Sequence, residues 1–97
     1  QINQLNKQFM KIELFVVNDQ YAVECVENGD LEALREYLSD PSCYATLDGP
    51  ITLNSEAEAA AYIDGLFYGF VERAPAERWV LRADNPDDKA IIDIFNE

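Results

Sequence analysis

Hydrophobic and polar residues alternate in two segments near the start of the chain, and a period of two predicts strands. Alternation in residues 11–17 (KIELFVV) and in residues 21–26 (YAVECV) places one set of apolar side chains of each segment on a single face, which in 21–26 consists of Tyr21, Val23 and Cys25. The inner side of the first predicted strand carries Ile12, Leu14 and Val16. Residues 18–20 (NDQ) favour a tight connection between the two segments, so we expect a β-hairpin here.

The longest helical pattern covers residues 54–73, and we expect the other elements to pack against it. Ser55 and Glu58 have the spacing of a capping box, which predicts where this helix begins. Gly65 and Gly69 lie four residues apart on another flank, where they indicate either close approach of a second element or an early helix end. The apolar stripe at helical spacing consists of Ala59, Ile63, Leu66, Phe67 and Phe70.

The remaining segments predict two shorter helices and further extended chain. A helix is expected from Asp30, a good N-cap, to about Ser39. Residues 43–53 indicate two short extended pieces around a turn, and residues 78–83 alternate as a strand. A last helix begins at Asn85. The order β-β-α-β-α-β-α predicts an α+β fold, in which helices cover one face of a small, mainly antiparallel sheet.

The length of 97 residues and a hydrophobic content of 48% fit one domain, 1–97, with the polar residues 1–8 as a flexible lead-in. No apolar segment is long enough to cross a membrane and no signal-peptide pattern opens the chain, so we expect a cytoplasmic protein. Cys25 and Cys43 form no metal-binding motif. Reduced thiols are the expected state, and a disulfide between them stays open.

Negative charge is concentrated in the first two thirds of the chain. The net charge is −12, and twelve of the 19 acidic residues lie between Glu13 and Asp64, where Arg35 is the one basic residue. Such an excess repels nucleic acid and speeds encounters with basic surfaces. We therefore expect a basic protein partner and no direct binding of DNA or RNA.

Reaction chemistry has little support in the sequence. The chain contains no histidine, which excludes Ser-His and Cys-His catalysis, and carboxylates are too abundant for any one pair to indicate acid-base chemistry. Residues 84–88 (DNPDD) share some features with a calcium loop but lack its glycine and its distal glutamate. We expect a protein without catalytic activity, metal or cofactor.

A row of carboxylates on the first predicted helix is the strongest candidate for a binding surface. Glu32, Glu36 and Asp40 follow at i, i+4 and i+8, where like charges cost about 0.2–0.5 kcal/mol per pair. The row is either an ordinary solvated face or a series of carboxylates that imitates the phosphates of DNA. Further candidates near turns and helix starts are Asp19, Glu27, Asp30, Asp48, Glu56 and Glu58.

Two stretches, one from KIELFVVNDQYAVECVENGD through LREYLSD and the other WVLRADNPDD, resemble the small phage or prophage anti-CRISPR proteins that inhibit the type I-F surveillance complex by mimicking DNA. The resemblance implies a non-catalytic inhibitor that occupies the Cas subunits where target DNA would bind. Two other classes stay open. One is an immunity-type or anti-restriction inhibitor of another basic nuclease, and the other is an acidic accessory domain without a nucleic-acid-related partner.

Overall fold

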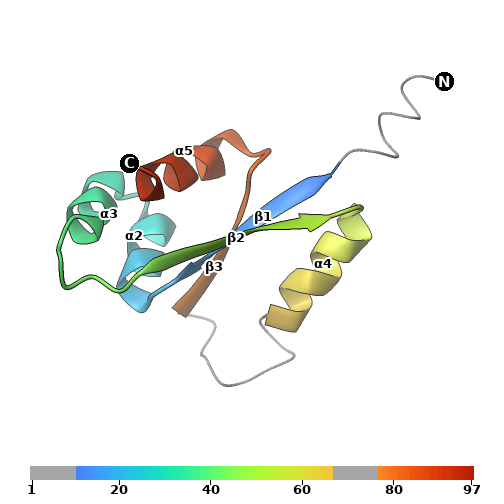
Figure 1. Cartoon of the computed structure of the whole chain (residues 1–97), viewed down its shortest axis with the longest axis horizontal. Coiled ribbons are helices and arrows are strands. Elements are labelled where there is room, and N and C mark those ends of the chain that lie inside the picture. The colour runs from blue at the N-terminus through green and yellow to red at the C-terminus, as the bar shows by residue number, and fades with distance from the viewer. Residues whose placement is uncertain (1–10, 67–76) are drawn as a thin grey trace.

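The computed structural model describes residues 11–66 and 77–97, which form an antiparallel sheet with helices on both faces (Figure 1). Within these ranges the sheet has three strands in the order β2-β1-β3. The α+β class and the antiparallel sheet predicted from the sequence are confirmed. The elements are β1 Ile12–Asn18, α2 Gln20–Asn28, α3 Leu31–Leu38, β2 Thr46–Leu53, α4 Glu56–Asp64, β3 Arg78–Arg82 and α5 Pro86–Phe95.

The central strand β1 has apolar residues on both of its faces. Ile12, Leu14 and Val16 are buried on one side, as their alternation predicted, but Val17 on the opposite side is also fully buried. Antiparallel pairing places Leu14 opposite Ile51 of β2 and opposite Arg82 of β3. A strand that is apolar on both faces needs a cover on each, so helices are required above and below the sheet.

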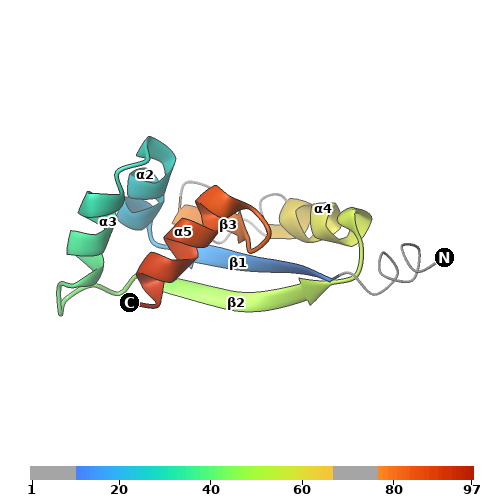
Figure 2. The same ribbon diagram turned by 90° about the horizontal axis from the view of Figure 1, so that it is seen from above.

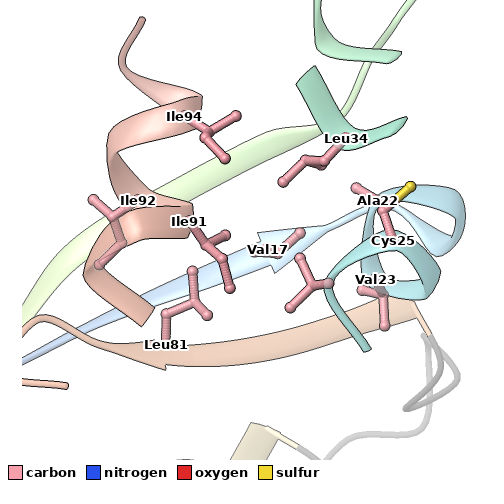
Figure 3. Packing of buried hydrophobic residues seen from close by; sticks show 10 residues of the cluster. Val17, Ala22, Val23, Cys25, Leu34, Leu81, Ile91, Ile92 and Ile94 are labelled. Atoms are coloured by element: carbon pink, nitrogen blue, oxygen red, sulfur yellow. The ribbon is translucent and has the colours of Figure 1, made fainter. Parts of the chain in front are cut away.

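The larger core lies on the face covered by α2, α3 and α5 (Figure 3). Leu34 of α3 and Leu81 of β3 are fully buried there, together with Val17 of β1. Ile91, Ile92 and Ile94 supply the apolar side of α5. These side chains come from elements far apart in the sequence, and their burial joins α2, α3 and α5 to the sheet.

The smaller core lies on the other face, beneath α4. Ala59 of α4 packs with Ile12 and Leu14, and Tyr62 and Ile63 pack against this cluster. The prediction that helices cover only one face is therefore wrong. The predicted long helix is described as far as α4, whereas its continuation to residue 73, with Phe67, Gly69 and Phe70, lies outside the described residues, as do residues 1–8.

The segment 21–26 is the second correction, because it is helical and forms no hairpin with β1. Its buried residues are Ala22, Val23, Cys25 and Val26. A strand would place Val23 and Cys25 on one side and Ala22 and Val26 on the other, whereas one face of a helix buries all four.

The ends of α2 carry capping signals that fit this helix. The Asp19 carboxylate accepts a hydrogen bond from the amide of Ala22 at 3.0 Å, as an N-cap does. Gly29 has a left-handed backbone at φ 70, and its amide donates to the carbonyls of Cys25 and Val26. Gly29 therefore ends a helix, where the sequence indicated the end of a strand.

The other predicted elements are close to those observed. Asp30, Ser55 and Asn85 are the N-caps of α3, α4 and α5. The extended chain predicted over residues 43–53 is one strand, β2. Both cysteines are free thiols, with Cys25 buried and Cys43 partly exposed. Among residues 11–66 and 77–97, no helix combines the length and apolar character needed to cross a membrane.

Candidate functional site

The predicted acidic residues lie at two ends of the fold and do not form one surface. In two perpendicular views, α2 and α3 are neighbours at one end, and α4 lies at the other (Figures 1 and 2). Asp48 is in β2, opposite Val16, and so belongs to the sheet face that α4 covers. Glu56 and Glu58 begin α4. On or beside α2 and α3 are Asp19, Glu27, Asp30, Glu32, Glu36 and Asp40.

Three of the carboxylates at the α2 and α3 end hold local structure. Asp19 and Asp30 accept the amides of Ala22 and Ala33 at 3.0 and 3.1 Å, as N-caps. Asp40 Oδ1 accepts the amide and the hydroxyl of Ser42, and these hydrogen bonds lower the pKa of Asp40. Each of these groups has a structural role that removing its side-chain oxygens would disturb.

The predicted carboxylates outside the α2 and α3 end also accept hydrogen bonds from other groups of the protein. Arg82 bonds both oxygens of Glu56, at 2.8 and 3.0 Å, and also bonds Asp84. Hydrogen bonds from this guanidinium lower the pKa of Glu56 and of Asp84. Glu58 accepts from the amide of Asn54 at 3.4 Å. Asp48 accepts a hydrogen bond from the Asn18 side chain. These three predicted residues are less suited to meet a partner than residues on α3.

Four exposed glutamates on α2 and α3 have side-chain carboxylates, here called the α2–α3 carboxylates, that form no hydrogen bond or ion pair with any residue that the structure describes. They are Glu24, Glu27, Glu32 and Glu36. The neighbouring base, Arg35, is bound to Glu97, with Nε at 2.9 Å from Oε1. The charge of the α2–α3 carboxylates is therefore left for solvent or a partner. Glu24 was missed from the sequence because a strand was predicted where α2 lies.

The sequence patterns also gave no prediction of a tyrosine pair that lies between α2 and α3. The rings of Tyr21 and Tyr37 lie edge to face, with centroids 4.7 Å apart and planes at 69°. Together with Ala33, Glu36 and Asp40 they line a groove of about 420 Å³, here called the tyrosine groove. The sequence signal for this groove is Asp19. When Asp19 is taken as a helix N-cap, Tyr21 lies in the first turn of α2, where its ring is exposed, and not on the inner side of a strand.

The structure offers little for catalysis or metal binding in the ranges it describes. Cys25 is buried, and burial raises the pKa of its thiol, which disfavours the reactive thiolate. Among residues 11–66 and 77–97, no three His, Cys, Asp or Glu side chains are grouped so that they could hold a metal ion. What these residues can do is present fixed negative charge beside exposed aromatic rings.

No protein family, curated protein or solved structure matches this chain.

Proposed function

We propose that the chain is a non-catalytic inhibitor that binds the DNA-binding site of a type I-F CRISPR-Cas surveillance complex as an acidic DNA mimic and blocks target DNA. The observation that carries this proposal is the set of α2–α3 carboxylates, exposed and without a partner among the described residues, beside a base already bound to Glu97. Such a surface offers negative charge to a lysine- and arginine-lined channel.

The arrangement on two helices supports mimicry rather than a diffuse acidic surface. Asp19 and Asp30 cap α2 and α3, and Leu34 anchors α3 in the larger core. Carboxylates on helices fixed in this way are held in place before the partner arrives, so less conformational entropy is lost on binding.

The identity of the target rests on the resemblance of two stretches of the sequence to inhibitors of the type I-F complex, since charge alone fits any basic nucleic-acid-binding protein. An inhibitor of another basic nuclease would present the same kind of surface. The proposed site of action is the cytoplasm of the host bacterium, where a surveillance complex meets its target.

A competition experiment tests the proposal. Purified type I-F surveillance complex is mixed with labelled target duplex and increasing amounts of the protein, and bound duplex is measured at several salt concentrations. We expect the protein to displace the duplex, and its affinity for the complex to fall as salt screens the charge pairs. Binding of protein and duplex to the complex at the same time, or an affinity independent of salt, would contradict mimicry. An unrelated basic nuclease serves as the control target.

A further inference from the structure

The tyrosine groove combines aromatic rings with carboxylates on an exposed part of the surface. Tyr21 is 48% exposed, and its ring meets the ring of Tyr37 across the contact between α2 and α3. Glu36 and Asp40 line the same groove, Glu36 from α3 and Asp40 from just beyond its C-cap, Ser39. An aromatic pair with one exposed ring, Tyr21, beside two acids is unlike the fully polar surface that an ordinary solvated helix presents.

Both walls of the groove are held in place by contacts within the protein. The Tyr37 side chain packs against the larger core. On the other wall, both Ser42 hydrogen bonds reach Asp40 Oδ1. The second oxygen, Oδ2, has no hydrogen-bond partner among the described residues. The groove is therefore shaped before any ligand binds, with carboxylate oxygens still able to accept hydrogen bonds.

No cation among the described residues occupies the groove. Arg35, next to Glu36 in sequence, bonds Glu97 through both Nε and Nη2. Glu36 has no ion pair with any residue in the described ranges. The charge of the groove is thus complementary to a positive group supplied from outside.

We propose that the tyrosine groove receives an arginine side chain of the partner protein, with the guanidinium against the tyrosine rings and hydrogen-bonded to Glu36 and Asp40. This inference rests on the proposed function, since it assumes a basic protein partner. A guanidinium is planar, stacks on aromatic rings and bonds carboxylates through two N–H groups at once. A lysine ammonium satisfies the charge but lacks the planar contact, and phosphate groups would be repelled.

Two peptides of equal charge test the choice of arginine. Hexa-arginine and hexalysine are titrated into the full chain by calorimetry at fixed salt. We expect hexa-arginine to bind about two- to fivefold more tightly, the size of a surface cation–π contact. Tyr21→Leu keeps charge and apolar bulk but removes the ring, and should abolish this preference. Tyr44→Leu is the matched control, because Tyr44 is 88% exposed and does not line the groove. It should leave the preference unchanged.

A second pair of variants tests the carboxylates. Glu36→Gln should weaken hexa-arginine binding more than Glu32→Gln, which removes the same charge from the same helix outside the groove. Equal binding of both peptides to the unmodified chain, or an arginine preference that survives Tyr21→Leu, would overturn the groove proposal. These measurements do not involve the surveillance complex. Failure to displace target duplex would thus contradict the proposed function alone, whereas a lost peptide preference would contradict the groove alone.

Discussion

Arg35 of α3 and Glu97 at the end of the described chain form a two-pronged ion pair, with Nε to Oε1 and Nη2 to Oε2 both at 2.9 Å. This contact joins residues 62 positions apart and ties the chain end to α3. The ion pair also occupies the one basic residue between Glu13 and Asp64. Removing Arg35 should therefore change both the pH dependence of stability and the local charge.

Replacing Arg35 by Gln should lower the free energy of unfolding at neutral pH, and the decrease should be smaller in acid. Hydrogen bonds from Arg35 lower the pKa of Glu97 below its ordinary value of 4.5, so the stabilisation is present above that pH and is lost as the pH falls through the lowered pKa. The difference in unfolding free energy between Arg35→Gln and the unmodified chain should therefore shrink in acid, as measured by urea unfolding across pH. Arg35→Lys is the control that keeps the charge. A difference that is constant with pH would contradict the ion pair.

Replacing Asp19 by Ala should destabilise α2 and change the titration of a tyrosine. Loss of the N-cap should cost about 0.5–2 kcal/mol in urea unfolding, and Asp19→Asn should retain most of it. Interaction with the Asp19 carboxylate raises the pKa of Tyr37 above its ordinary value of 10.0, so the pKa should fall in Asp19→Ala.

The same link predicts a loss of stability in alkali. A raised tyrosine pKa gives stabilisation that is fully present below about pH 10 and is lost as the pH rises above it. Ultraviolet absorbance of tyrosinate measures the pKa. An unchanged titration in Asp19→Ala would mean that the Asp19 carboxylate does not act on the hydroxyl of Tyr37.

Replacing Gly49 by Ala should destabilise the sheet. Gly49 has φ 131, and an added Cβ would lie 2.8 Å from the carbonyl oxygen of Leu14 in β1. The strained backbone and the clash should together cost about 1–3 kcal/mol. Gly65→Ala is the matched control, since a Cβ there meets nothing within 4 Å. It should leave thermal unfolding unchanged or raise the midpoint slightly. Equal effects of both substitutions would contradict the close approach of β2 to β1.

Replacing Glu32 and Glu36 together by Gln should separate stability from function. Two like charges at i, i+4 are removed while size and helix propensity are kept, so unfolding should be unchanged or shift slightly toward greater stability. Affinity for the surveillance complex should fall by about tenfold or more, because basic groups of the partner lose their counter-charges. Calorimetric unfolding and binding on the same samples provide the measurement.

A charge-matched variant controls for the total field of the protein. Glu13→Gln combined with Asp64→Asn removes the same charge from β1 and α4, away from α2 and α3. This variant should bind almost as tightly as the unmodified chain. If both double variants lose affinity equally, net charge rather than the α2–α3 carboxylates governs binding.

The sequence by itself determined the features that depend on neighbouring residues. Asp30, Ser55 and Asn85 cap helices where predicted, because a capping side chain bonds an amide two or three residues ahead. The alternation of Ile12, Leu14 and Val16 predicted a strand with a buried side. The acidic excess around Arg35 is a matter of composition and needed no structure.

Contacts between distant segments could be decided only by the tertiary structure. The short apolar pattern of residues 21–26 fits a period of two or of 3.6, and packing against Leu34 and Val17 in the larger core selects the helix. Burial of both faces of β1 depends on α4 crossing one side and α5 the other. Folding also brings Glu56 into an ion pair with Arg82, whereas Glu36 stays exposed beside Tyr21 and Tyr37. Such pairings arise from distance in space, which a linear pattern of residues does not contain.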